Sequence, residues 1–339
     1  MENVFFVVGP TAVGKSDVAA EVARACGGEI VSADAFQIYA GLDLLTAKPD
    51  DATRARVPHH LIGTISLSEA MTAERFSASA SKVIAEIHAR GKCVFVVGGS
   101  GMYVQTLTHG LSPLPAADPT LRRELDQQTA PELLALLRER DPETAAKIDP
   151  RNKHRIVRAL EICLLTGRPA AELRSRKAPA IDPGGVLLFR DRAELYQRIN
   201  ERVLLMFRNG VVDEVRAAGE IGATAAKTLG LSHIRELMAG RISEAECVTR
   251  IQQATRHYAK RQLTWFQRQT NFEPLNLSLH ESSDAVEWIT QKARLAFSAL
   301  GRWSRSRQRR NRNAPSLSVW NRTVSRSGTS RMRWRSSES

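Results

Sequence analysis

A run of apolar residues that leads directly into a glycine loop constrains this chain more than any other feature. Residues 4–8 are apolar and β-prone, the next eight read Gly-Pro-Thr-Ala-Val-Gly-Lys-Ser, and residues 17–25 then have a helical pattern. This spacing between a strand and a helix matches the P-loop, in which backbone N–H groups and a helix N-terminus converge on phosphate oxygens. The predicted phosphate-binding residues are Gly9, Pro10, Thr11, Ala12, Val13, Gly14, Lys15 and Ser16. Lys15 would reach the terminal phosphate, and the Ser16 hydroxyl would hold a magnesium ion.

Composition places the chain among soluble globular proteins. Hydrophobic residues make up 42% and charged residues 25% of its 339 residues. Because the sequence has neither an apolar run long enough to span a bilayer nor a signal-peptide pattern, we expect a cytoplasmic protein with no membrane association. The cysteines are too far apart to indicate a zinc site or a disulfide framework. They are Cys26, Cys93, Cys163 and Cys247.

Most of the net charge of +13 lies at the C-terminal end. Residues 301–339 contain eleven Arg, no Lys and one acidic residue, Glu338, and so carry +10 of it. This Ser/Arg/Asn-rich composition is typical of disordered segments. The tail could bind RNA through phosphates, but a basic segment without a folded frame more often contributes nothing.

Further apolar strands alternate with helices along the chain. Strands are predicted at residues 29–32, 92–97 and 186–189, and the central one is apolar throughout, as in a parallel sheet covered on both faces. Residues 118–176 read almost entirely as helix. The predicted fold class is therefore α/β, a P-loop NTPase-like parallel sheet flanked by helices, with an inserted all-helical domain. The expected segments are a first part of the core (1–115), the helical insertion (116–180), the rest of the core with C-terminal helices (181–300) and the basic tail (301–339).

Several shorter helices and one long helix complete the pattern. Helices are predicted at residues 70–90, 193–208, 212–218, 232–239 and 243–269. In the longest, Ile251, Tyr258 and Trp265 repeat every seven residues and are expected to face the core. Arg250, His257, Arg261 and Arg268 form a neighbouring basic line. This line is either a solvated face or a surface for the RNA backbone.

Asp34 follows the second strand and is the carboxylate that its position predicts to take part in chemistry. At the carboxyl end of a parallel strand it would lie near the P-loop phosphates. There it could act as a general base or support magnesium. The alternative is an Asx turn that caps the local backbone.

The apolar strand at residues 92–97 lacks a residue that phosphoryl-transfer P-loop proteins carry. The apolar strand ends in Gly98-Gly99-Ser100-Gly101, with no carboxylate to hold magnesium and organise water. ATP hydrolysis is therefore not the predicted chemistry. Gly98 and Gly99 would let the backbone approach a ligand closely, with a hydroxyl from Ser100, or would simply form a tight turn.

Two adjacent histidines, His59 and His60, resemble a metal pair only at first sight. Adjacent residues on a strand point to opposite faces. We interpret both as structural or as neighbours of the substrate.

Eight motifs occur in one order along residues 3 to about 300. They are Gly9–Ser16, Ser32-Ala-Asp-Ala-Phe-Gln-Ile-Tyr39, Thr46-Ala-Lys-Pro49, Pro58-His-His-Leu61, Val97-Gly-Gly-Ser-Gly-Met-Tyr103, Gly110-Leu-Ser-Pro113, Arg155-Ile-Val-Arg-Ala-Leu-Glu161 and Thr255-Arg-His-Tyr-Ala-Lys-Arg-Gln-Leu-Thr-Trp265. Together they resemble the tRNA dimethylallyltransferase (tRNA isopentenyltransferase) family. The basic tail lies outside the resemblance.

The resemblance implies an activity and a role for matching residues. The family transfers the dimethylallyl group of dimethylallyl diphosphate to the exocyclic amine of the adenosine on the 3′ side of the anticodon. On this pattern Lys15 offsets leaving-group charge and Asp34 takes the proton from the amine. Ser100 stands where the family usually has Thr, a residue that helps to place the substrate. The stretches matched to tRNA contact are Asp34, Ala35, Phe36 and Gln37, and His154, Arg155, Ile156, Val157 and Arg158 in the insertion. The implied partners are the tRNA anticodon stem-loop and dimethylallyl diphosphate, with Mg²⁺ as cofactor and a monomeric protein.

The pattern departs from the family at four positions. Ala35 stands where Ser is common, His154 where Gln is usual, Leu231 where Tyr is expected, and Met102 where a larger residue is expected. These departures concern base placement. Two other function classes share parts of the pattern: a P-loop small-molecule kinase, and a non-catalytic RNA-binding protein that uses a nucleotide as a switch.

Overall fold

The computed structural model describes residues 4–112, 114–175 and 184–312. Its strands are β1 (Val4–Val8), β2 (Glu29–Ser32), β3 (His59–His60), β4 (Val94–Gly98), β5 (Gly185–Phe189) and β6 (Glu273–Asn276). Its helices are α1 (Lys15–Ala25), α2 (Asp51–Arg56), α3 (Ala73–Ala89), α4 (Gly101–His109), α5 (Pro119–Asp126), α6 (Ala130–Arg140), α7 (Pro142–Lys147), α8 (Lys153–Thr166), α9 (Ala170–Ser175), α10 (Arg192–Arg208), α11 (Val211–Ala217), the 3₁₀ turn η1 (Ala225–Lys227), α12 (Leu231–Met238), α13 (Glu244–Gln269) and α14 (Ser282–Arg312).

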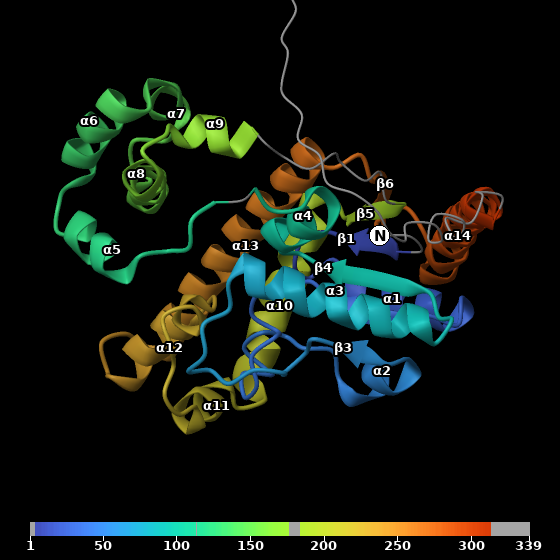
Figure 1. Cartoon of the computed structure of the whole chain (residues 1–339). Coiled ribbons are helices and arrows are strands. Elements are labelled where there is room, and N and C mark those ends of the chain that lie inside the picture. Colours follow the sequence, from blue (N-terminus) through green and yellow to red (C-terminus); the bar gives the residue numbers. More distant parts are fainter. Residues whose placement is uncertain (1–3, 113, 176–183, 313–339) are drawn as a thin grey trace, which may run out of the picture. The chain divides into compact units, whose positions relative to one another are not determined.

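The strands form one parallel sheet in the order β3-β2-β4-β1-β5-β6 (Figure 1). Strand β4 lies between β1 and β2, with Val94 opposite both Val4 and Glu29. The P-loop follows β1, Asp34 follows β2, and the turn at Gly99 follows β4. Because carboxyl ends of parallel strands share one edge of a sheet, this strand order brings the three segments together. The predicted α/β fold class is confirmed.

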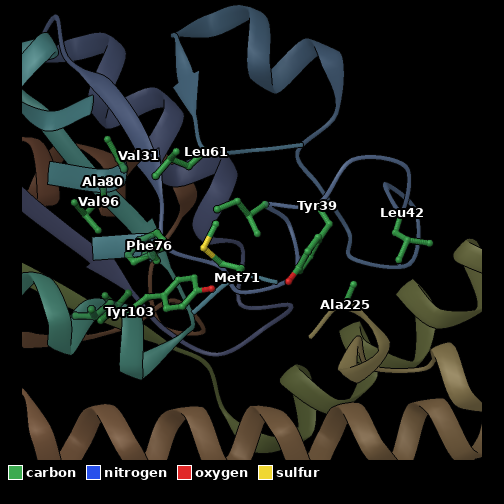
Figure 2. Close-up of a cluster of buried hydrophobic side chains, with 14 of the residues drawn as sticks. Val31, Tyr39, Leu42, Leu61, Met71, Phe76, Ala80, Val96, Tyr103 and Ala225 are labelled. Carbon is green, nitrogen blue, oxygen red and sulfur yellow. The ribbon is translucent and has the colours of Figure 1, made fainter. Parts of the chain in front are cut away.

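Alternate side chains of the strands enter two separate apolar cores. On β1, Phe6 and its neighbours at even positions face one core, while Phe5 and Val7 face the other. Figure 2 shows part of the first core, where Phe76 of α3 stacks on Tyr103 of α4 with ring centroids 3.8 Å apart. Helix α1 packs into the second core. This two-sided burial explains why the strands are apolar throughout instead of alternating.

Helices α5–α9 have an apolar core of their own, formed by residues between Leu125 and Leu173. The carboxylate of Glu161 is fully buried within this group of helices. Glu161 accepts hydrogen bonds from Arg122 (2.9 Å), from the backbone N–H of Asp118 (2.7 Å) and from Arg158. Burial alone would raise the pKa of Glu161, but its two arginines lower it below the ordinary value. Loss of one partner of such a buried pair typically costs about 3–5 kcal/mol of stability.

The sequence analysis missed several elements, among them α2, β6 and α4. The short helix α2 has no apolar stripe and depends on its N-cap, Asp50, which accepts a hydrogen bond from Thr53 N at 2.8 Å. Strand β6 contains Pro274, which a sheet tolerates at an edge, where β6 lies. Helix α4 follows the glycine turn after β4 and buries Tyr103, Val104 and Leu107. Helix α2 thus depends on its cap and β6 on its position in the sheet, and neither shows a hydrophobic period.

Some predicted boundaries were wrong. The helix predicted at residues 70–90 begins at Ala73, because Thr72 caps it through a hydrogen bond from Arg75 N, and β4 begins at Val94 and not at residue 92. The tail was predicted to be disordered from residue 301, but α14 continues to Arg312. Arginine and glutamine are good helix formers, and no proline interrupts residues 301–312. The rest of the predicted tail, and the predicted boundary at residue 180, lie outside the described residues.

In the described ranges, helices that combine the length and the apolar character needed to cross a bilayer do not occur.

Candidate active site

The P-loop has the backbone conformation that phosphate binding requires. Gly14 has a φ of +99° and Ala12 a φ of +64°, so the loop turns sharply before α1 begins at Lys15. The first N–H groups of α1 therefore point out of the helix toward the sheet edge. Lys15 Nζ donates to Pro10 O at 2.9 Å and folds back over the loop.

A cavity of about 560 Å³ opens beside this loop. It is lined by Thr11, Ala12, Gly14, Lys15, Ser16, Asp17, Ile30, Ser32, Asp34, Gln37, Thr46, Ala47, Lys48, Pro49, Asp50, Thr53, His59, Ile62, Val97, Gly98, Arg198, Glu201, Arg202 and Leu205. Of the eight predicted loop residues, Gly9, Pro10 and Val13 are absent from this lining within the described chain. Gly9 is fixed by packing instead, because a Cβ there would lie 2.3 Å from Leu188 O.

Asp34 lies in the same cavity as the P-loop lysine. Its Oδ1 accepts hydrogen bonds from Phe36 N (2.9 Å) and Gln37 N (3.2 Å). The Asx-turn interpretation therefore describes one oxygen correctly. The second oxygen accepts no hydrogen bond from the described part of the chain and is available to a substrate. One carboxylate thus caps its own loop and faces the cavity.

Ser100 lies behind Asp34 and does not line the cavity in the described chain. Its Oγ accepts a hydrogen bond from Ala35 N at 2.8 Å. Gly98 and Gly99 were predicted to let the backbone approach a ligand or to form a tight turn. Gly98 lines the cavity, and both glycines also lie against protein groups. A Cβ on Gly98 would lie 2.2 Å from Ala33 O, and one on Gly99 would lie 2.2 Å from Gln262 Nε2. Ser100 and Gly98 therefore contact the backbone on either side of Asp34.

Three arginines around the P-loop were missed by the sequence analysis. Arg202 Nη2 donates to Thr11 Oγ1 at 2.6 Å, Arg198 Nε to Ala12 O at 3.0 Å, and Arg190 Nε to Val13 O at 3.0 Å. Arg202 Nε is buried without a hydrogen-bond partner among the described residues, which fits a bound anion at this point. Arg198 and Arg202 are one helical turn apart in α10, directly after β5. In the sequence, two arginines four residues apart in a helix that follows a predicted strand could have indicated these cations.

The cations of the site perturb one another. Burial lowers the pKa of Lys15 to about 8, opposed by the Asp34 carboxylate and helped by Arg202. Burial also lowers the pKa of Arg202 to about 10, again opposed by Asp34. Both groups gain from a bound polyanion, because it would replace the water that burial removed.

We expect the affinity for a diphosphate ligand to fall above pH 8. The lysine loses its proton as pH rises through the lowered pKa, and the neutral amine attracts the anion less strongly. KM for the diphosphate should rise by up to about tenfold per pH unit between pH 8 and 10. Steady-state kinetics across this range provide the measurement, with Lys15→Arg as a control whose profile stays flatter. A wild-type KM that is constant to pH 10 would contradict this role.

A smaller chamber of about 50 Å³ adjoins the main cavity. It shares Thr11, Asp34, Thr46 and Arg202 with the cavity, and adds apolar walls. The added residues are Phe36, Leu45, Val203, Met206, Thr228, Leu229, Ile251, Thr255 and Tyr258. Six of the nine added residues are apolar, whereas several charged side chains line the cavity at the P-loop.

The loop after Asp34 is held in place from two sides. Gln37 Nε2 donates to Ala47 O (2.9 Å) and Thr46 O (3.3 Å), so its side chain closes the loop on itself. The Glu214 carboxylate of α11 accepts from Leu44 N (2.7 Å) and from the next backbone N–H. Gln37 and Phe36 line the two chambers, whereas Ala35 is held against Ser100.

The stretch matched to tRNA contact in α8 separates into two faces. Ile156 and Val157 were predicted to contact tRNA, but they are 0% and 5% exposed in the core of the insertion. Arg158 is tied to Glu161 and to Pro115 O (2.7 Å). His154 and Arg155 are exposed. Helical periodicity explains the correction, since successive residues cannot all face one partner.

The two histidines of β3 have separate protein partners. His60 Nε2 contacts Glu29 Oε2 at 2.7 Å, and His59 Nδ1 contacts Val57 O at 2.8 Å. His59 also lines the cavity. Both observations agree with the structural or substrate-adjacent interpretation.

Helix α13 differs in detail from the expected pattern. Its buried positions are Cys247, Ile251, Thr255, Ala259, Gln262 and Phe266, while Tyr258 and Trp265 are only partly buried. On the basic line, Arg250 pairs with Glu236 and Glu246. The Arg261 guanidinium lies 5.7 Å from the Tyr258 ring centroid.

The parallel sheet, the P-loop and the cluster of cations opposite a carboxylate define a P-loop α/β protein. The family model described as IPP transferase matches residues 37–269. The chain is 43% identical over 277 residues to the tRNA dimethylallyltransferase of Geobacter sulfurreducens, covering 78% of this chain and 89% of that protein. The chain therefore belongs to the IPP transferase family, as the motif order predicted.

Further relatives and solved structures support the assignment to this family. The tRNA dimethylallyltransferase of Akkermansia muciniphila is 42% identical over 282 residues, with 83% of this chain and 96% of that protein covered. The full-length tRNA isopentenylpyrophosphate transferase of Bacillus halodurans superposes with a TM-score of 0.67 at 31% identity, over 90% of this chain and 100% of that chain. A eukaryotic dimethylallyltransferase acting on tRNA gives a TM-score of 0.70 at 25% identity, over 81% of this chain and 74% of that chain.

Proposed function

We propose that the protein transfers the dimethylallyl group of dimethylallyl diphosphate to the N6 amine of the adenosine 3′-adjacent to the tRNA anticodon. The products are N6-(dimethylallyl)adenosine and diphosphate. The observation that carries the proposal is the shared cavity, in which Asp34 faces the same space as Lys15 and Arg202. The names of the relatives support the transferred group and a tRNA acceptor.

The residues divide the chemistry between the two halves of the cavity. The allylic carbon–oxygen bond breaks and its electron pair leaves with diphosphate, whose charge Lys15, Arg202 and the α1 N-terminus offset. The adenine nitrogen forms the new bond to carbon, and Asp34 accepts the proton that the amine loses. The apolar chamber beyond Asp34 would exclude water from the carbocation-like transition state.

Magnesium fits the donor set at the P-loop. Ser16 lines the cavity with Asp17 and Asp50, and all three offer oxygen, the element that Mg²⁺ prefers. The described residues contain no cluster of three His, Cys, Asp or Glu placed to hold a metal. We therefore propose that Ser16 and diphosphate oxygens hold the ion, which would supply charge neutralisation when bound.

The RNA would approach from outside the sheet edge. An anticodon-loop adenosine reaches a buried carbon only when its base is extruded, which single-stranded loop geometry makes inexpensive. Exposed basic residues on α8 and α13, including Arg155 and Arg261, support contact with phosphates. We further propose that the protein acts as a monomer in the cytoplasm.

A double-label assay tests the function. The protein is incubated with tRNA and either labelled dimethylallyl diphosphate or labelled ATP. We expect label to enter tRNA only from the prenyl donor. Phosphate transfer from ATP to a small acceptor would support a kinase instead, and tRNA retention without covalent labelling would support an RNA-binding switch.

Arg155→Ala is expected to weaken tRNA binding without changing the KM for the donor. If this exposed side chain contacts one phosphate, the slope of log Kd against log salt should fall by about 0.7–0.9. Binding measured between 50 and 300 mM salt provides the slope. Arg140→Ala, at an exposed arginine of the same insertion, controls for the general loss of charge. An equal change in both variants would contradict a specific contact.

A further inference from the structure

Helix α13 places one buried amide between the P-loop and the turn after β4. The Gln262 side chain is 5% exposed. Its Oε1 accepts a hydrogen bond from Thr11 N at 2.8 Å, and its Nε2 donates to Gly99 O at 2.9 Å. A side-chain amide has one acceptor and one donor end, so it joins an N–H to a carbonyl without carrying charge.

Helix α13 also lies close to the loop that contains Asp34, the proposed general base. The Tyr258 hydroxyl, one turn before Gln262, lies next to the side chains of Ser100 and Gln262. Ser100 in turn accepts from Ala35 N, next to Asp34, at 2.8 Å. Burial raises the pKa of Tyr258, as does the nearby Asp34 carboxylate, so the phenol stays protonated and able to donate. Thr11 is therefore connected to Ala35 through the Gln262 amide, the Gly99–Ser100 backbone and the Ser100 hydroxyl, and the Tyr258 hydroxyl lies beside this connection.

Glycines on the opposing turn show how closely α13 is seated. A Cβ on Gly99 would lie 2.2 Å from Gln262 Nε2, and a Cβ on Gly101 would lie 2.4 Å from the Trp265 ring. Such separations leave no room for a side chain at either position. The helix thus lies in direct contact with the turn, and the Gln262 amide is part of that contact.

We propose that Gln262 and Tyr258 are positioning residues that fix the separation between the diphosphate cradle at Thr11 and the base at Asp34. This inference rests on the proposed function, because it assigns the two residues to the alignment of donor and acceptor. Neither side chain needs to touch the reacting atoms. Displacement of reacting groups by about 1 Å can cost about 100-fold in rate, so a bridge of this kind affects the chemical step.

Gln262→Met and Tyr258→Phe test the bridge. Methionine keeps the length of the side chain and loses both hydrogen bonds, while phenylalanine loses only the hydroxyl. We expect single-turnover rates at saturating donor and tRNA to fall about 10- to 100-fold for Gln262→Met and about 10-fold for Tyr258→Phe, with the tRNA Kd within twofold. The double variant should be about as slow as the slower single variant, because both changes break one bridge.

Gln252→Met is the matched control on the same helix. Gln252 donates to Asn200 O at 3.3 Å, outside the bridge, and its replacement should leave the rate within twofold. If Gln262→Met turned over no more slowly than Gln252→Met, the bridge would have no catalytic role. The inference would be equally overturned if only the KM for the donor changed.

Amide hydrogen exchange tests the bridge without relying on activity. In Gln262→Met, exchange at Thr11 N–H and at Ala35 N–H should both accelerate relative to wild type and to Gln252→Met. Acceleration at Thr11 alone would show that the two loops are not coupled and would overturn the proposal. Prenyl transfer by the wild-type chain is measured separately. If the wild-type chain did not transfer the group, the proposed function would be wrong, whereas the exchange experiment would still test the bridge.

Discussion

Asp34→Asn should lower the rate of prenyl transfer by about 100- to 10,000-fold while tRNA binding stays within about twofold of wild type. This is the range that loss of a general base usually produces. The asparagine oxygen can still accept from Phe36 N and Gln37 N, the two hydrogen bonds that Oδ1 makes now. The loop therefore keeps its cap, and only the ability to accept a proton is removed.

Single-turnover labelling of tRNA measures the effect of this change on the chemical step. Asp51→Asn is a suitable control, since Asp51 is an exposed carboxylate that does not line the cavity in the described chain. Its rate should change by less than about threefold. An Asp34→Asn enzyme as fast as the control would show that another group accepts the proton.

The parts of the structure that the sequence predicted are those whose signals are local. The P-loop is a continuous stretch between a strand and a helix, so its residues lie together whatever the rest of the chain does. Asp34 was found because it directly follows an apolar strand. Its closeness to Lys15 additionally needed β1 and β2 to flank β4, a strand order that only the structure supplies.

The residues that were missed act over long sequence separations. Arg202 bonds to Thr11 across 191 positions, and Gln262 bonds to the same residue across 251. In the sequence, Arg202 is typical of a solvent-exposed helix position, and Gln262 does not belong to an apolar periodic pattern. Only the packing of α10 and α13 against the sheet edge shows that both side chains point inward.

Other residues were assigned to the tRNA contact although the structure buries them, because every residue of one linear motif was taken to be exposed. Residues 154–158 were assigned to tRNA as one stretch, but an α-helix turns by about 100° per residue, since it has 3.6 residues per turn. Ile156 and Val157 therefore fall on the buried face when Arg155 is exposed. Arg158 also points toward the interior of the insertion, because it forms an ion pair with the buried Glu161 carboxylate.

Arg202→Met is expected to lower the rate of prenyl transfer by about 100- to 1,000-fold, the loss typical when one donor that stabilises developing charge is removed. The Arg202 guanidinium contacts Thr11 with one nitrogen and leaves its buried Nε without a partner in the described chain. An anion in the cavity would supply that partner. Charge on the leaving oxygen grows as the allylic bond breaks, so this contact strengthens in the transition state and should affect kcat more than KM.

Arg202→Lys separates charge from geometry. Lysine restores a cation but not the planar fork that can hold Thr11 and an anion together, so we expect a partial recovery of the rate. Arg208→Met, at an exposed arginine at the end of the same helix, should turn over within about twofold of wild type. Single-turnover rates and donor KM values for the three variants decide the matter: if Arg202→Met changed only KM, the arginine would bind the donor without stabilising its departure.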